Sequence, residues 1–293
     1  MRRLRLCMFA LLLSGVAAGQ SSPPIALQTV EIRSGPLQLK AFLWTPAGPG
    51  PFPAVLFNHG SGGADPEHTA GLTMKEAAER LGPLFVRHGY AFLYLFRRGQ
   101  GLSAEQGPFI QDLLQREKAA HGDEARKHLQ YILLTTDHLD DVLAALSFLK
   151  TVHAVDPHRI AIAGHSFGGQ LTLLAAERDP AVRAAVTFAA AAGSWEATPE
   201  LRDRLLTAVR KTATPILLIQ AANDYSTAAG RDLAADLERQ HKPYALKIYP
   251  PVGQTREEGH NLVYNAVPQW ESDVFRFLDE YVRPGHKKEP DRP

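Results

Sequence analysis

Short apolar runs separated by amphipathic segments fill most of the 293-residue chain. Two early segments, 30–33 and 38–45, alternate enough between apolar and polar residues to predict an opening antiparallel pair of strands. Later runs are continuously apolar, which is typical of strands that are buried on both faces of a parallel sheet. These later runs lie at 54–58, 90–96, 159–164, 184–190, 215–220 and 244–249. The pattern therefore predicts a mostly parallel eight-stranded sheet.

Helical patterns lie between the predicted strands. In residues 137–150, Leu139, Val142 and Leu146 fall on one helical face, and acidic residues stand at the start. Strand and helix alternate in this way over about 260 residues, so we predict one α/β domain, residues 25–283, with helices on both faces of the sheet. Further helices are predicted over 75–88, 167–178, 227–240 and 268–282.

Two segments do not fit this alternation. Residues 103–136 are polar, carry a helical pattern and lie between the fourth strand and the next sheet helix. We therefore predict a helical insertion that roofs the site as a cap and limits it to small or medium-sized substrates. Residues 284–293 are rich in charge and proline, which predicts a disordered tail.

The first nineteen residues differ from the rest of the chain. Three arginines among the first five residues precede an apolar stretch, 4–18, and small residues follow up to Gly19. This pattern predicts a secretory signal peptide, residues 1–19, and hence a secreted or periplasmic protein. The alternative is a membrane anchor, but the stretch is shorter than the roughly 20 residues of a spanning helix. We therefore expect no stable membrane association after cleavage.

Composition narrows the classes of partner. The sole cysteine, Cys7, lies in the predicted signal peptide, so we expect a mature chain without a disulfide. Loss of that segment leaves 29 basic against 31 acidic residues, a balance that indicates no nucleic-acid partner. The twelve histidines are scattered and do not have the spacing of a metal site. The glycine-rich motif of a phosphate-binding loop is also absent from the sequence. We therefore expect no metal and no cofactor.

The sequence G-H-S-F-G at 164–168 follows one predicted strand directly and begins the next predicted helix. A serine in this strand–turn–helix setting stands on a strained turn, where Gly164 and Gly168 remove side chains that would collide. Its hydroxyl is then held above the sheet, close to the Phe167 N–H at the helix start. We therefore predict that Ser166 is a nucleophile and that Phe167 supplies one oxyanion donor; the alternative is an ordinary glycine-rich turn.

A serine hydroxyl is a weak nucleophile and requires a base. After the last predicted strand the chain has two histidines: His260, on a predicted loop before the final helix, and His286, in the tail. For a serine in this strand–turn–helix setting, the expected order along the chain is serine, acid, histidine. The acids that follow predicted strands in the right region are Asp224 and Glu196. We favour Asp224, because it follows the strand just before the histidine strand and lies in a turn sequence. It would then hold the tautomer of His260.

The glycine-rich loop at 58–63, N-H-G-S-G-G, is expected to supply the second oxyanion donor, because glycines let the backbone approach a substrate. We select the Ser61 N–H for this role, with the Gly62 N–H as the alternative. We expect His59 to pack within this loop rather than to take part in catalysis.

Several further residues follow predicted strand ends, which is where ligands of α/β sheets bind. Arg98 is a candidate for holding a substrate carboxylate, and the alternative for Arg97 and Arg98 is an ion pair that anchors the following turn. Trp195 and Tyr225 are candidates for lining the pocket, and packing is the alternative for both.

The chain resembles the α/β-hydrolase superfamily, and within it the dienelactone hydrolase-like and prolyl oligopeptidase-like catalytic domains. The resemblance rests on H-G-S-G-G, R-R-G-Q-G-L-S, V-D-P-H-R-I-A-I-A-G-H-S-F-G-G, N-D and G-H, in this order over nearly the whole predicted mature chain. It implies the α/β-hydrolase fold, oxyanion donors at Ser61 and Phe167, and a nucleophile, acid and base at Ser166, Asp224 and His260. Dienelactone hydrolases use cysteine where this chain has serine, and prolyl oligopeptidases carry a propeller domain for which this chain has no room.

These features predict a secreted serine hydrolase that cleaves carboxylic esters through an acyl-enzyme intermediate, without a cofactor. One alternative is a peptidase of the prolyl oligopeptidase-like type that acts on short peptides. A non-enzymatic alternative is a catalytically inactive binding module that retains the fold. The combined serine, acid, histidine and oxyanion loop argue against that module, because binding alone does not require them together.

Overall fold

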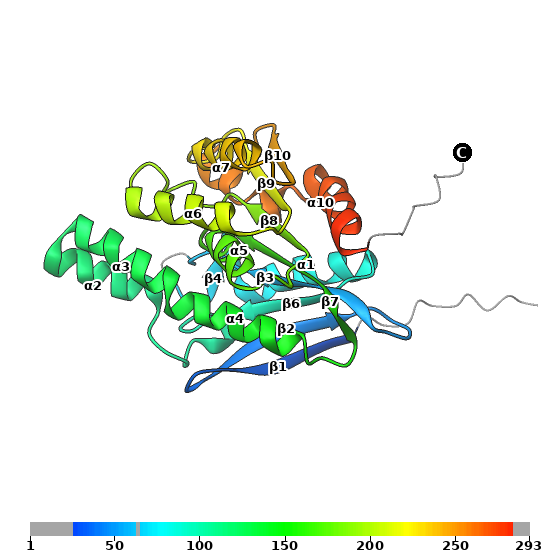
Figure 1. Cartoon of the computed structure of the whole chain (residues 1–293). Helices are drawn as coiled ribbons and strands as arrows, with labels where there is room; N and C mark the ends of the chain where they lie inside the picture. The colour runs from blue at the N-terminus through cyan, green and yellow to red at the C-terminus, as the bar shows by residue number, and fades with distance from the viewer. Residues whose placement is uncertain (1–25, 63–64, 284–293) are drawn as a thin grey trace, which may run out of the picture.

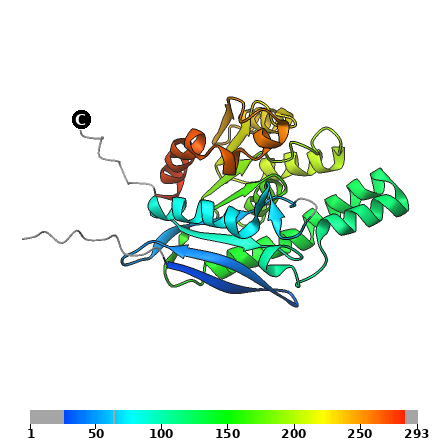
Figure 2. The same ribbon diagram turned by 180° about the vertical axis from the view of Figure 1, so that it is seen from behind.

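The computed structural model describes residues 26–62 and 65–283, so the predicted signal peptide and the predicted disordered tail lie outside the described residues. The described chain forms an eight-stranded sheet in the order β1-β2-β6-β3-β7-β8-β9-β10, with helices on both faces (Figures 1 and 2). This is the predicted α/β-hydrolase architecture. The strands are β1 (Ala26–Ser34), β2 (Leu37–Thr45), β3 (Phe52–Asn58), β6 (Ala91–Phe96), β7 (Val155–His165), β8 (Ala184–Phe188), β9 (Ile216–Ala221) and β10 (Tyr244–Tyr249).

The sheet is antiparallel at its first edge and parallel elsewhere. β1 pairs antiparallel with β2, and β2 pairs antiparallel with β6, which confirms the predicted opening pair. All other neighbours pair in parallel. The strands of the parallel core are buried on both faces, but the residues of β10 are only half-buried because this strand lies at the edge of the sheet.

Two hydrophobic cores lie on opposite faces of the sheet. In β3, Ala54 and Leu56 belong to one core, and Val55 and Phe57 to the other, as the alternation of a strand requires. The first core packs under α4 (Asp137–Leu149), α5 (Phe167–Arg178), α6 (Pro199–Lys211) and α7 (Ala228–Arg239). The second core packs under α1 (Met74–Arg87) and α10 (Val267–Val282).

Helix α6 is absent from the sequence-based expectations. Its signal is nevertheless present, because Leu201, Leu205, Ala208 and Val209 recur at helical spacing and are buried against the first core. Pro199 stands in the first turn, where proline is favoured because its missing N–H is not needed.

Between β6 and α4 the chain forms a helical hairpin of α2 (Ile110–His121) and α3 (Asp123–Thr135), preceded by the short helix η1 (Gly101–Ser103). Gly122 joins the two helices with a φ of 90°, a conformation that glycine adopts without steric cost. Figure 1 shows the hairpin reaching outward from the body of the domain. Between β3 and α1 lies a two-stranded ribbon of β4 (His68–Thr69) and β5 (Leu72–Thr73).

The described helices are each too short or too polar to cross a bilayer.

Candidate active site

Ser166 lies between the end of β7 and the first residue of α5. Its φ of 54° and ψ of −117° place a residue with a Cβ in the left-handed region, which costs about 1–3 kcal/mol. The Ser166 N–H donates to the Phe188 carbonyl, with 2.8 Å between the two atoms, and so ties the turn to the neighbouring strand β8. The local backbone is therefore strained and held in place by the sheet.

The two glycines of the motif permit close backbone contact. A Cβ added at Gly168 would lie 2.0 Å from the Asn58 carbonyl oxygen, and one at Gly164 would lie 2.3 Å from the Gly168 carbonyl oxygen. Both distances are far below van der Waals contact, so only glycine fits at either position. The start of α5 therefore packs directly on the end of β3, as the sequence motif predicts.

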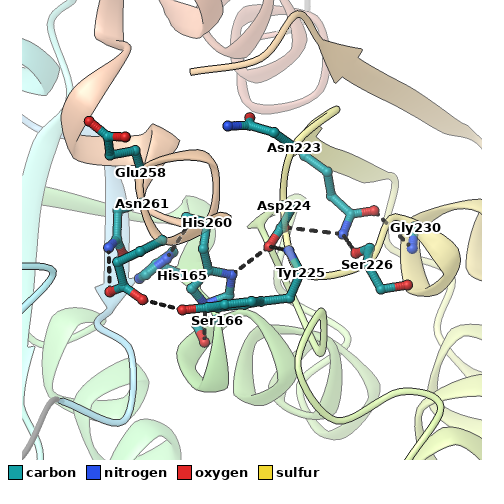
Figure 3. A network of polar contacts seen from close by, with 12 residues as sticks. His165, Ser166, Asn223, Asp224, Tyr225, Ser226, Gly230, Glu258, His260 and Asn261 are labelled. Carbon is teal, nitrogen blue, oxygen red and sulfur yellow. Dashed lines mark hydrogen bonds and ion pairs between the residues drawn. The ribbon is translucent and has the colours of Figure 1, made fainter. Parts of the chain in front are cut away.

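The structure brings Ser166, His260 and Asp224 together in one line of hydrogen bonds (Figure 3). The His260 Nε2 atom lies 2.9 Å from the Ser166 hydroxyl oxygen, and the His260 Nδ1 atom lies 2.8 Å from a carboxylate oxygen of Asp224. The side chain of Asp224 is fully buried, and that of His260 is 12% exposed. The histidine is thus oriented by a carboxylate that water does not reach, while its other nitrogen meets the hydroxyl.

Residues close to Asp224 in the sequence hold its carboxylate in place. Its first carboxylate oxygen accepts the Tyr225 N–H at 2.7 Å, and its second lies 3.4 Å from the Gln220 amide nitrogen. The competing acid, Glu196, is exposed, and the carboxylate bonded to His260 is that of Asp224. The structure therefore places Asp224, and not Glu196, beside the histidine.

His260 closes the short helix α8 (Arg256–His260), where the sequence predicted a loop, and the helix α9 (Leu262–Asn265) follows. A capping box between Thr255 and Glu258 fixes the start of α8. The side-chain amide of Asn223 donates to the carbonyl oxygens of Val252 and Thr255, at 2.9 and 2.8 Å. Asn223 thereby joins the loop of the acid to the loop of the histidine.

His165 is a further residue that the sequence reasoning did not identify. Its Nε2 atom donates to the His260 carbonyl oxygen at 3.0 Å, and its ring is buried beside the ring of His260. Burial, and to a lesser extent the nearby His260, lower the pKa of His165 to about 3, so the ring is neutral. Its place in the motif, directly before the serine at the end of a strand, is the available sequence signal.

The loop predicted to supply an oxyanion donor lies against Ser166. Gly60, Ser61 and Gly62 line the same pocket as Ser166 and Phe167. Phe167 is the first residue of α5, so its N–H has no acceptor within the helix. His59, in contrast, is fully buried and stacks on Tyr94, which agrees with the packing role expected from the sequence.

The pocket above Ser166 has a volume of about 400 Å³. Its walls come from the β4–β5 ribbon, the α2–α3 hairpin, the segment 191–198 after β8, and α8. The hairpin contributes Gln111, Leu114, Arg126 and Gln130. The insertion therefore forms one wall of the pocket.

Two of the three predicted substrate-binding residues do not line this pocket. Arg98 pairs with Asp141 at 2.8 Å and with Asp137 at 3.0 Å, so its guanidinium anchors the strand end to α4. Trp195 is 1% exposed and donates its indole N–H to Asp232 at 2.8 Å. The prediction that these two side chains face a substrate is wrong, because long-range partners draw both into the protein.

Tyr225, the third predicted residue, does line the pocket. Its ring lies 4.8 Å from the ring of His260, and its hydroxyl donates to Glu257. Burial, followed by the bond to Glu257, raises the pKa of Tyr225 to about 12. Tyr225 is thus a neutral wall of the pocket beside the histidine.

No group of three His, Cys, Asp or Glu side chains within residues 26–62 and 65–283 is arranged to hold a metal ion.

Comparison with known proteins gives one family and several relatives. The sequence profile of the dienelactone hydrolase family matches residues 39–281. The quorum-quenching protein AidA of Acinetobacter baumannii (strain MDR-ZJ06) is 27% identical over 164 residues, which is 56% of this chain and 44% of that protein.

Two solved structures share the fold. The acylaminoacyl peptidase of Pyrococcus horikoshii has a TM-score of 0.63 at 17% identity, over 91% of this chain and 43% of the peptidase. Est1E of Butyrivibrio proteoclasticus, solved with ferulic acid bound, has a TM-score of 0.61 at 20% identity, over 87% of this chain and 99% of Est1E. This chain thus spans less than half the length of AidA and of the peptidase, and nearly all of Est1E.

Proposed function

The chain belongs to the dienelactone hydrolase family, and we propose that it is a serine hydrolase that cleaves carboxylic esters through an acyl-enzyme intermediate. The observation that carries this proposal is the line of hydrogen bonds from buried Asp224 through His260 to the Ser166 hydroxyl. Nucleophile, base and orienting acid occupy the geometry that activates a serine.

The proposed reaction follows from this geometry. Ser166 attacks the ester carbonyl while His260 removes the hydroxyl proton, and Asp224 stabilises the resulting imidazolium. The N–H groups of Ser61 and Phe167 bind the negative oxygen of the tetrahedral intermediate. His260 then protonates the leaving alcohol, and water cleaves the acyl-enzyme by the same route in reverse.

The pocket supports small or medium-sized substrates. Its volume of about 400 Å³ lies near the lower end of the roughly 300–1,000 Å³ usual for small-molecule sites. The similarity to Est1E extends over nearly all of both chains, and Est1E was solved with ferulic acid bound, which supports a small organic substrate. The similarity to acylaminoacyl peptidase supports a peptidase as the second candidate, although that match covers only 43% of the peptidase.

The test compares p-nitrophenyl acetate, butyrate and octanoate with aminoacyl p-nitroanilides, together with labelling by a fluorophosphonate. We expect ester turnover and labelling by the wild type, and loss of both in Ser166→Ala. Ser147→Ala, on the exposed side of α4, is the matched control and should retain both. Turnover of the anilides alone would favour the peptidase, and absence of both turnover and labelling would contradict either enzyme.

We also propose that the protein is exported, on the basis of the arginines and the apolar stretch within residues 1–19. The mass of the protein recovered from the periplasm or the medium tests this proposal. A chain that begins at Gln20 is the expected result, and a secreted or periplasmic chain that retains residues 1–19 would contradict it.

A further inference from the structure

Arg97 is a fully buried cation, and no carboxylate of residues 26–62 or 65–283 is bonded to it. It follows β6 directly, and its guanidinium donates to the carbonyl oxygens of His59 at 2.8 Å and of Gly60 at 2.7 Å. Within the described part of the chain, its Nε atom has no hydrogen-bond partner. A buried charge is costly unless it is compensated, and here the compensation comes from two carbonyl oxygens and, at longer range, from the charge of Asp141.

The neighbouring arginine shows the contrast. Arg98 holds Asp141 and Asp137, and it anchors a strand end as the sequence alternative proposed. Arg97 shares no such bond and has backbone carbonyls as its acceptors. Burial lowers the pKa of Arg97 to about 10, which leaves the guanidinium charged at neutral pH.

The two acceptors of Arg97 belong to the oxyanion loop. The carbonyl of Gly60 and the N–H of Ser61 are parts of one trans peptide unit, so they point in opposite directions. Because Arg97 holds this carbonyl from inside the protein, the Ser61 N–H faces away from the guanidinium. Ser61 lines the pocket together with Ser166, so an N–H that is turned away from the guanidinium is available to a substrate there.

A second donor reinforces the same peptide. The His59 Nδ1 atom lies 2.7 Å from the Gly60 carbonyl oxygen, while its Nε2 atom accepts the Arg97 backbone N–H at 3.3 Å. Burial, and then the charge of Arg97, hold the pKa of His59 well below its usual value, so this ring is neutral. Two donors on one carbonyl polarise the peptide and make its N–H a stronger donor.

The other predicted oxyanion donor also lies beside this cation. The guanidinium carbon of Arg97 is 5.5 Å from the centre of the Phe167 ring. Arg97 therefore touches the loop of one donor and the residue of the other, and a fixed positive charge stands behind the place where negative charge would develop.

We propose that Arg97 is a positioning residue, which fixes and polarises the Gly60–Ser61 peptide so that the Ser61 N–H is preset as an oxyanion donor. The inference rests on the proposed serine hydrolase function, and it selects Ser61 over Gly62 for this role.

The test uses Arg97→Gln and Arg97→Lys with two readouts. For Arg97→Gln we expect kcat for p-nitrophenyl butyrate to fall about 100-fold with KM within threefold, as for loss of an oxyanion donor. The affinity for a trifluoromethyl ketone, which forms a tetrahedral adduct with the serine, should fall in parallel. Arg97→Lys keeps the charge and one donor, so it should lose only about tenfold in each.

The matched control is Arg283→Gln. The Arg283 guanidinium donates to the Gly89 carbonyl and lies 4.1 Å from the ring centre of Tyr90, so it shares the carbonyl and ring contacts of Arg97 away from the pocket. Unlike Arg97, it also pairs with Asp279, at 3.4 Å. Its replacement should lower the urea midpoint and leave kcat unchanged.

Two results would overturn the proposal. One is a folded Arg97→Gln or Arg97→Lys that keeps wild-type kcat. The other is a loss of kcat without loss of ketone affinity. If Arg97→Gln does not fold, Arg97→Lys alone decides between these results. Labelling of the wild type by the fluorophosphonate is measured first, so that a failure of the proposed hydrolase function is seen separately.

Discussion

The carboxyl ends of the parallel strands and the α2–α3 hairpin border the same pocket but are built in different ways. At the strand ends, the Asp224 side chain is buried, and the start of α5 packs so closely on β3 that a Cβ at Gly168 has no room. In the hairpin, few side chains are buried, and the space around Gly122 is open. The proposed chemistry thus stands on rigid backbone, while the substrate meets a wall that tolerates change.

The largest expected effect on activity is that of Asp224→Asn, at the carboxyl end of β9. An amide cannot hold His260 in the tautomer that accepts the serine proton, so kcat should fall about 10⁴-fold. Glu117→Gln, on the hairpin, should leave kcat within twofold because its side chain does not line the pocket. Steady-state ester hydrolysis gives both values, and a loss below tenfold for Asp224→Asn would show that another acid serves the histidine.

A pair of glycine substitutions tests the difference in backbone packing. In Gly168→Ala the new Cβ would lie 2.0 Å from the Asn58 carbonyl oxygen, so the free energy of unfolding should fall by about 3 kcal/mol or more. In Gly122→Ala the new Cβ meets nothing within 4 Å, so the free energy of unfolding should fall only by the backbone strain at φ 90° and ψ −178°, about 1–3 kcal/mol. Urea unfolding measures both, and equal losses would remove the contrast between the two regions.

Acid should lower the free energy of unfolding through histidines near the carboxyl ends of the strands rather than through those of the hairpin. Burial holds the pKa values of His59, His138 and His165 below their usual value, and that of His165 falls to about 3. The unfolded chain therefore binds protons below about pH 6.5 that the native state cannot accept, so stability present above this pH is lost as the pH falls. His165 alone, with its pKa of about 3, should contribute about 2 kcal/mol between pH 6.5 and pH 5. His121 and His128 of the hairpin are exposed.

Urea unfolding at pH 7, 6 and 5 measures this loss. His165→Gln should reduce the decrease in unfolding free energy between pH 7 and pH 5, whereas His121→Gln should leave it unaltered. A decrease that is equal in both variants would locate the acid sensitivity elsewhere.

The smallest expected effect concerns specificity in the hairpin. Leu114 is 4% exposed and lines the pocket, so Leu114→Ala should make room for a longer acyl chain. The ratio of kcat/KM for p-nitrophenyl hexanoate to that for the acetate should rise about tenfold, as one or two methylenes allow. Leu113→Ala, in the same helix but outside the pocket lining, is the control. An unaltered ratio in Leu114→Ala would mean that the hairpin does not bound the acyl group.

The fold was largely predictable because its signals are local. The continuous apolar run at 54–58 corresponds to β3 at Phe52–Asn58, and the run at 215–220 to β9 at Ile216–Ala221. A strand buried on both faces must be apolar throughout, so its own sequence identifies it. The order of Ser166, Asp224 and His260 predicts the arrangement that the structure displays, and their roles in catalysis remain predictions.

The errors arise where a distant partner decides the outcome. Arg97 and Arg98 are adjacent and chemically equal, yet one binds carbonyls of the loop at 58–63 and the other binds Asp141, 43 residues away. No local pattern distinguishes them, because the choice depends on which element packs against each side chain. Trp195 was misassigned for the same reason, since Asp232 of α7 accepts its indole N–H.

The backbone at Ser166 has a consequence for how the sequence is free to vary. Its φ of 54° opposes folding for any residue with a side chain, whereas glycine would adopt the same angle without strain. A chain optimised only for stability would therefore place glycine at 166. The serine found there costs folding free energy, and the nucleophilic role proposed for Ser166 would account for that cost.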